Sequence, residues 1–152
     1  MAKAAIIYES VYGNTKMVAE AIAEGLKEAG VEATLHVLKG FDTATLKDYD
    51  AVLVGSPNHA GGATMGIKGF IGKLGKLKLE GKWVAAFDTY GGSAHAQALK
   101  KMSDSLAKSA PGMKLVIPGL SVKVMGMKGP IMEGELPRGR EFGKSFAARM
   151  KS

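Results

Sequence analysis

The sequence contains no cysteine among its 152 residues. This absence excludes disulfide bonds, thiolate metal ligands and a cysteine nucleophile, and it is compatible with a reducing compartment. Long apolar runs are also missing, since no stretch approaches the roughly 18 residues of a membrane-spanning helix. The amino terminus has no signal-peptide pattern, because only five apolar residues separate Lys3 from Glu9. We therefore expect a cytoplasmic protein that does not enter the membrane.

Acidic residues are fewer than basic ones. The chain has 14 Asp and Glu against 21 Lys and Arg, for a net charge of +7. This excess indicates an acidic partner or nucleic acid, and a lysine-rich surface without a specific partner is the alternative. Aromatic residues make up only 7% of the chain, and those near the lysines are expected to be buried. Stacking platforms for bases are not evident, so nucleic-acid binding is disfavoured.

The remaining composition is that of a globular protein. Hydrophobic residues make up 46% of the chain and charged residues 23%. A chain of this length usually folds as one domain, so we expect a single domain over residues 1–152.

Apolar runs and helical periodicity alternate along the chain. Continuous apolar runs at 4–8, 51–55 and 83–87 predict strands covered on both faces, with Trp83 in the core. Partial alternation at 31–38 predicts a strand at a sheet edge, with His36 on its solvent side. A further strand is expected at 114–124, bent at Pro118-Gly119.

Helices are expected between these strands. Val18, Ile22 and Leu26 share one face of a helix that Gly30 ends. Further helices are expected at 66–74, around Leu99–Leu106, and from Pro137 to the end, with a helical turn between Asp42 and Asp50. Because strands and helices alternate with short connections, the sequence predicts an α/β fold. The expected architecture is a doubly wound, five-stranded parallel sheet in three α/β/α layers.

The stretch Glu9–Thr15 lies between the first expected strand and the first expected helix. A helix N-terminus carries unpaired backbone N–H groups and the positive end of the helix dipole, so it attracts anions. Ser10, Asn14 and Thr15 add side-chain donors, and Gly13 permits a close or left-handed backbone. The stretch therefore predicts a phosphate site, with simple helix capping as the alternative. Neither the Walker A pattern nor G-x-G-x-x-G is present.

Two further segments follow expected strands at the same edge of the sheet. Residues 56–65 and 88–94 are both rich in glycine and small polar side chains. Ligands of open parallel sheets bind beyond the carboxyl ends of the strands. The three segments are therefore expected to meet around one ligand.

With these three segments in this order, the sequence resembles the flavodoxin family over nearly the whole chain. It is most similar to short flavodoxins and to the flavodoxin domains of flavodiiron proteins. Ser10–Thr15 matches the family's FMN-phosphate loop, in which a hydroxyl residue and two further positions precede Gly-x-Thr. Val54–His59 resembles the segment beside the flavin ring, and Asp88–Gly92 resembles the loop over the ring's other side. The ending Arg140–Lys144 resembles the family's last helix.

The resemblance implies an FMN-binding electron-transfer protein that shuttles low-potential electrons between redox partners, without catalytic residues or a metal of its own. It implies that Tyr90 stacks on the ring, with an idle surface aromatic as the alternative, and that Asp88 orders its loop. His59 is expected to hydrogen-bond the ring or the ribityl chain, or to stay exposed without a role. The implied cofactor-binding residues are Ser10, Val11, Tyr12, Gly13, Asn14, Thr15, Ser56, Pro57, Asn58, His59, Ala60, Gly61, Asp88, Thr89, Tyr90, Gly91 and Gly92.

Two features differ from the family pattern. No aromatic residue lies between Ser56 and Met65, where most flavodoxins have a second one, and the net charge is positive where most flavodoxins are acidic. The positive charge indicates acidic redox partners, such as ferredoxin-like carriers or reductases. The lysines expected to face such a partner are Lys68, Lys73, Lys76, Lys78 and Lys82.

The main alternative is an FMN-dependent NAD(P)H or quinone oxidoreductase on the same fold. Such enzymes usually carry longer insertions around the flavin ring, and the segments of this chain are short. A phosphorylated signalling receiver of the same topology is also disfavoured. Its acceptor Asp would end the third strand, where this chain has Ser56, and Glu9 has no acidic neighbour.

Overall fold

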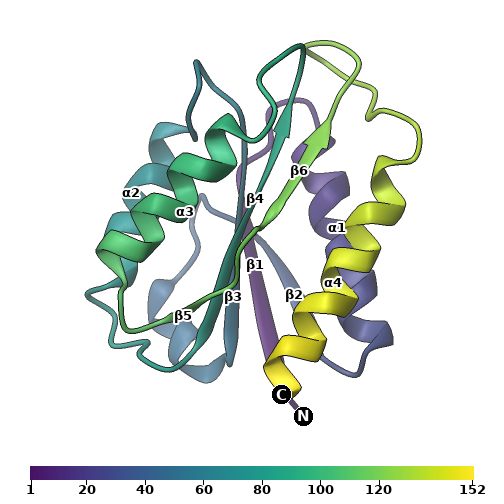
Figure 1. Ribbon diagram of the computed structural model, residues 1–152. Coiled ribbons are helices and arrows are strands. Elements are labelled where there is room, and N and C mark those ends of the chain that lie inside the picture. The colour runs from purple at the N-terminus through teal and green to yellow at the C-terminus, as the bar shows by residue number, and fades with distance from the viewer.

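The computed structural model describes residues 1–152, which form one parallel sheet with helices on both faces (Figure 1). The strand order is β2-β1-β3-β4-β5, and β6 also pairs with β4. The strands are β1 (Lys3–Tyr8), β2 (Glu32–Val37), β3 (Ala51–Pro57), β4 (Trp83–Tyr90), β5 (Lys114–Leu115) and β6 (Leu120–Lys123). The helices are α1 (Asn14–Glu28), the 3₁₀ helix η1 (Thr43–Asp48), α2 (Met65–Leu74), α3 (Gln97–Ser109) and α4 (Glu135–Lys151). The expected doubly wound fold in three layers is confirmed.

The fifth expected strand is divided into two short pieces. β5 pairs with the start of β4, where Lys114 lies opposite Trp83, and β6 pairs with its end, where Leu120 lies opposite Phe87. The break contains Pro118 and falls where the sequence predicts it. All strand pairs are parallel, so every strand ends at the same edge of the sheet.

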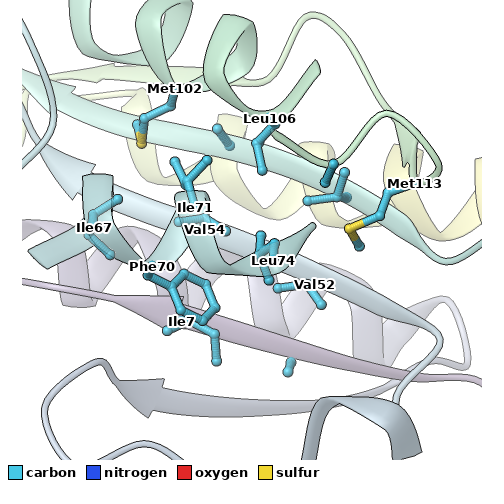
Figure 2. Close-up of a cluster of buried hydrophobic side chains, with 14 of the residues drawn as sticks. Ile7, Val52, Val54, Ile67, Phe70, Ile71, Leu74, Met102, Leu106 and Met113 are labelled. Atoms are coloured by element: carbon cyan, nitrogen blue, oxygen red, sulfur yellow. The ribbon is translucent and has the colours of Figure 1, made fainter. Parts of the chain in front are cut away.

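The side chains of the strands alternate between two cores. On β1, Ile7 faces α2 and α3, whereas Ile6 faces α1 and α4. Figure 2 shows the first of these cores, where side chains of the strands meet those of α2 and α3. Its labelled residues are Ile7, Val52, Val54, Ile67, Phe70, Ile71, Leu74, Met102, Leu106 and Met113.

Helices α1 and α4 lie side by side on the other face (Figure 1). Their approach is unusually close at Gly25 of α1, where a Cβ atom would lie 1.9 Å from the carbonyl oxygen of Arg140. Glycine is therefore the residue that allows this packing distance. None of the four α-helices combines the length and the apolar character that a bilayer crossing demands.

Two expected loops begin later than the sequence suggests. Ser56 and Pro57 belong to β3, and Asp88 and Thr89, which lie opposite them, belong to β4. The polar side chains at these strand ends do not prevent the backbone from continuing the ladder. The expectation that these residues lie in loops is therefore wrong, and their positions are set by the sheet.

Two smaller expectations also need correction. Trp83 begins β4 and is half-buried, with Lys114 Nζ 4.9 Å from its ring centroid, so it is not a core residue. Helix α4 begins at Glu135, which makes Pro137 its third residue. Proline is tolerated there because the first helical N–H groups have no acceptor within the helix.

Strand β2 is an edge strand, as expected, but its faces differ from the prediction. The side chains of Leu35 and Val37 are exposed. His36 is half-buried against Phe41, with 4.8 Å between the ring centroids, and burial lowers the pKa of His36. Phe41, in the chain leading into η1, covers the side of His36.

Candidate cofactor site

A cavity of about 140 Å³ lies at the carboxyl edge of the sheet, where β1 and β3 are neighbours and the strand order reverses direction. The three predicted segments meet around it, together with a fourth segment after β6. In Figure 1 this edge is at the top, opposite the two chain ends. The lining residues are Ser10, Val11, Tyr12, Asn14, Thr15, Pro57, Asn58, His59, Thr89, Tyr90, Gly91, Val124, Gly126 and Met127.

Ser10 and Gly13 shape the turn from β1 into α1. Gly13 is the residue before the helix and has φ of +90°, a left-handed conformation that favours glycine. The Ser10 hydroxyl oxygen accepts hydrogen bonds from the N–H groups of Gly13 (3.1 Å) and Lys16 (3.3 Å). Ser10 therefore caps the helix, and its own hydroxyl hydrogen stays free for another acceptor.

Several backbone donors of this turn have no partner in the protein. The N–H groups of Val11, Tyr12, Asn14 and Thr15 donate to no protein acceptor. Asn14 and Thr15 are the first two residues of α1, where the helix dipole is positive, and the first turn contains no acidic side chain. This arrangement is suited to an anion such as a phosphate group.

Two threonines connect the first segment to the third. The hydroxyl oxygens of Thr15 and Thr89 are 2.9 Å apart, and both side chains are buried. Only one hydroxyl can donate within the pair, so the hydrogen of the other is available to a ligand. The pair fixes the start of α1 against the end of β4 and places a donor at the cavity wall.

In the second segment, the hydroxyl of Ser56 is hydrogen-bonded within the protein, whereas the side-chain oxygen of Asn58 is not. Ser56 is fully buried, accepts a hydrogen bond from Thr64 N–H (2.9 Å) and donates to the Pro57 carbonyl (2.8 Å). By contrast, the buried Oδ1 of Asn58 has no hydrogen-bond partner in the protein. Because Asn58 lines the cavity, a ligand donor is the natural partner for this oxygen.

A tight turn follows Asn58. The backbones of His59 and Gly62 pair with each other through two hydrogen bonds of 2.7 and 3.0 Å. Ala60 and Gly61 between them both have positive φ. The turn projects beyond β3 and forms one border of the cavity, where the side chain of His59 is exposed.

Asp88, near the end of β4, connects the third segment to β6 and to the start of α3 through hydrogen bonds. Its carboxylate is fully buried and accepts hydrogen bonds from Ser121 Oγ (2.5 Å) and Leu99 N–H (2.8 Å). Ser121 Oγ in turn accepts the N–H of Ala96 (3.0 Å), the residue before α3, which has no side-chain cap of its own. Burial raises the pKa of Asp88, and the hydrogen bond from Ser121 opposes this shift. Asp88 therefore acts as a cap for α3, contributed by another element.

The fourth segment was missed by the sequence reasoning. Val124, Gly126 and Met127 line the cavity, and the ammonium group of Lys128 lies 5.9 Å from the ring centroid of Tyr12. Their glycine- and methionine-rich stretch has no chemical signature. The signal that could have found it is its position, directly after the carboxyl end of the fifth strand.

Some predicted residues lie beside the cavity and do not line it. As contacts to the cofactor they stay predictions. They are Gly13, Ser56, Ala60, Gly61, Asp88 and Gly92.

Comparison with known proteins assigns the chain to a family. The model of the flavodoxin domain matches residues 5–127. The chain therefore belongs to the flavodoxin family. Flavodoxins are FMN-binding flavoproteins, and FMN is the cofactor that this membership assigns.

Individual relatives carry two kinds of name. The chain is 39% identical over 98 residues to a flavodoxin of Aquifex aeolicus, which covers 60% of this chain. It is 32% identical over 116 residues to a protein of Archaeoglobus fulgidus named NAD(P)H dehydrogenase (quinone), which covers 57% of this chain. The matches span 52% and 61% of these two relatives, respectively.

The structural comparison agrees with the family assignment. The structure of a flavodoxin from the domain Archaea superposes with a TM-score of 0.85 at 26% identity. The superposition covers 99% of both chains. The flavodoxin-like fold expected from the sequence is therefore confirmed.

Proposed function

We propose that the protein is an electron carrier that uses FMN to shuttle low-potential electrons between redox partner proteins. The observation that carries this proposal is the group of unpaired backbone N–H donors at the start of α1, beside the buried pair Thr15–Thr89. These donors fit the phosphate of FMN, and the flavin supplies the redox chemistry when it is bound. The protein contributes binding, orientation and the electrostatic environment.

Each segment of the site then has a role toward the cofactor. Ser10, Asn14 and Thr15, with the backbone around Gly13, hold the phosphate. Asn58 Oδ1 accepts a hydrogen bond from the ribityl chain or from the ring, which satisfies its unpaired buried oxygen. Tyr90 is half-buried at the cavity wall and offers its ring as a stacking surface.

The size of the cavity supports transfer at the protein surface. Pockets that enclose a small ligand usually measure about 300–1,000 Å³, whereas this cavity measures about 140 Å³. We expect a cavity of this size to enclose only part of FMN, so that an edge of the flavin ring stays accessible. An accessible edge is what electron transfer to another protein requires.

Two carboxylates near the cavity make structural contacts. Asp88 caps α3 from its buried position, and Glu9 accepts a hydrogen bond from the hydroxyl of Thr64, the residue before α2. Asp88 is fully buried and lines no part of the cavity, so it is not available to exchange protons with a ligand there. This supports a carrier over an enzyme with its own acid–base chemistry.

A second candidate is an FMN-dependent NAD(P)H or quinone oxidoreductase. The Archaeoglobus relative has that name, and a second cavity of about 610 Å³ shares Ser10, Val11 and His59 with the first. A cavity of this size beside the cofactor would accommodate a second substrate. The two candidates differ in whether the protein alone consumes NAD(P)H.

The decisive experiment compares FMN with riboflavin, which lacks only the phosphate. Protein freed of flavin is titrated with each compound, and absorption and flavin fluorescence are recorded. Two or more hydrogen bonds to a charged group, at about 1.5–3 kcal/mol each, predict FMN binding at least ~100-fold tighter than riboflavin binding.

Equal affinities would contradict the phosphate site, and no binding of FMN at micromolar concentration would contradict the proposed function. Steady oxidation of NADH or NADPH by the FMN-loaded protein in the presence of benzoquinone would favour the oxidoreductase.

A further inference from the structure

The positive charge of the protein is concentrated on helices α2 and α3 and the residues that follow α2. Seven exposed lysines, which we call the lysine face, lie there, and none of them forms an ion pair. The ion pairs of the structure, such as Glu28–Arg140, all involve α4 on the opposite side of the sheet. The lysine face consists of Lys68, Lys73, Lys76, Lys78, Lys100, Lys101 and Lys108.

This face differs from the cluster that the sequence suggests. Lys82 is not part of it, because its ammonium group donates to the carbonyl oxygens of Lys47 and Tyr49 near the amino ends of the strands. Lys100, Lys101 and Lys108 of α3 take its place. Helices α2 and α3, which carry most of these lysines, pack against each other on one face of the sheet (Figure 1).

Two lysines of this face extend to the border of the cofactor cavity. A Cβ atom on Gly61 would lie 3.6 Å from Lys101 Nζ, and one on Gly62 would lie 3.5 Å from Lys68 Nζ. Both ammonium groups therefore lie against the turn 59–62. Asp104 shares a groove with them, but it lies beyond ion-pair distance from both.

Two exposed apolar side chains share cavity linings with His59, the first residue of this turn. Met65 at the start of α2 and Met127 of the fourth segment are each 82% exposed, and Met127 lines the cavity. Methionine adapts to different partner surfaces because its side chain is unbranched and flexible. An apolar centre with a charged rim is the usual anatomy of a protein interface.

We propose that the lysine face, with Lys68 and Lys101 at its border with the cofactor cavity, docks an acidic redox protein so that electrons pass over the turn 59–62 to FMN. This inference rests on the proposed function, and it names the surface and the charge of the partner. Unpaired lysines attract a negatively charged protein over distances of about a Debye length, roughly 10 Å at 0.1 M salt. They increase the rate of encounter more than the final affinity.

A nucleic acid is a poorer fit to the same charges. The aromatic residue of α2, Phe70, is buried in the core, and α3 contains none. The face therefore offers no ring on which bases could stack. The lysine face has the positive charge that would attract a nucleic acid, but it lacks aromatic rings on which bases could stack.

The test uses the FMN-loaded protein and a reduced, acidic [2Fe–2S] ferredoxin as the probe. One electron leaves the iron–sulfur cluster, which is oxidised, and reduces FMN, with any balancing proton taken from water. Stopped-flow absorption gives the second-order rate constant at low and high salt. The site variant is Lys68→Gln/Lys101→Gln.

The matched control is Lys27→Gln/Lys47→Gln, which removes the same charge. Lys27 lies in the last turn of α1, and Lys47 lies in η1 beside the start of β4. Both side chains are exposed and form no ion pair or hydrogen bond. FMN content is measured for every variant before the kinetics.

We expect the site variant to lower the rate constant about five- to tenfold at ~10 mM ionic strength, and the control to lower it less than about twofold. The difference should disappear at ~500 mM salt. Equal losses in both variants would overturn the proposal, as would an unchanged rate in the site variant. If the protein does not bind FMN at all, the proposed function fails first.

Binding to a DNA oligomer is measured for the same variants by fluorescence anisotropy. A loss of DNA binding in the site variant, with an unchanged ferredoxin rate, would overturn the proposal in favour of a nucleic-acid surface. No DNA binding, together with the expected kinetic loss, would support the acidic protein partner.

Discussion

Replacing Gly25 with alanine should destabilise the protein, although alanine is the better helix former. Gly25 lies within α1, where alanine would gain about 1 kcal/mol from helix propensity. Its Cβ atom would, however, lie 1.9 Å from the carbonyl oxygen of Arg140, whereas ordinary contact begins at 3.4 Å. Helix α4 must therefore move away by about 1.5 Å, the difference between these distances.

The size of the effect follows from these two opposing contributions. Inserting an extra methyl group into a packed core costs about 1–3 kcal/mol, and a backbone oxygen has no rotamer with which to move aside. Taking about 3 kcal/mol for the clash and subtracting the gain in propensity leaves a destabilisation of about 2 kcal/mol. For a chain of this size the melting temperature should fall by about 4–8 °C.

Gly69→Ala in α2 is the matched control. Gly69 is exposed and also helical, and a Cβ atom there would meet no other atom within 4 Å. The same substitution should therefore stabilise the protein by about 0.5–1 kcal/mol. Both variants should be measured by urea unfolding without FMN, since a bound cofactor adds its own stabilisation. A Gly25→Ala variant at least as stable as the parent would refute the close approach of α1 and α4.

Two further predictions concern the cofactor site. Gly13→Ala should destabilise the protein by about 1 kcal/mol and weaken FMN binding several-fold, because an alanine at φ of +90° is strained although its Cβ has open space. Urea unfolding measures the first effect and fluorescence titration with FMN the second. Unchanged stability and affinity would contradict the left-handed turn. The pKa of Asp88 is raised in the folded state, so folding is accompanied by proton uptake at pH values between the ordinary aspartate pKa and the folded pKa. The stability that Asp88 contributes therefore decreases as the pH rises through its folded pKa. The parent should accordingly gain stability relative to Asp88→Asn as the pH falls from 7 toward the ordinary aspartate range, and a difference that stays constant all the way down to that range would contradict the raised pKa.

The sequence predicted secondary structure best where the pattern of apolar residues matches the burial of the element. Continuous apolar runs such as Ala51–Val54 predicted the central strands, and the periodicity of Val18, Ile22 and Leu26 predicted α1. Strand ends were less predictable, because hydrophobic patterns describe side chains and the ladder is made by the backbone. Ser56 and Asp88 continue the strands although both side chains are polar.

Local sequence patterns also limited what could be predicted about the cofactor site and the lysine face. Ser10 and Thr15 could be assigned to one ligand because their residue types and spacing have a chemical meaning. Met127 could not, since a methionine has no preferred ligand and its place depends on the path of the chain after β6. The association of Lys68 with Lys101 depends on how α2 packs against α3, which no local pattern encodes.

The capping of α3 by Asp88 has a consequence for how this site can diversify. The start of the helix is anchored to β4 and β6 by hydrogen bonds from the N–H groups of Leu99 and Ala96 to Asp88 and Ser121, in addition to the bond from Gln97 N–H to the carbonyl oxygen of Ala94 in the preceding turn. The stretch between Tyr90 and Ala96 therefore carries only part of the task of positioning the helix. Its length and composition can vary over generations while the scaffold stays in place, so a border of the cofactor cavity can be adapted to a new ligand or partner without refolding the rest.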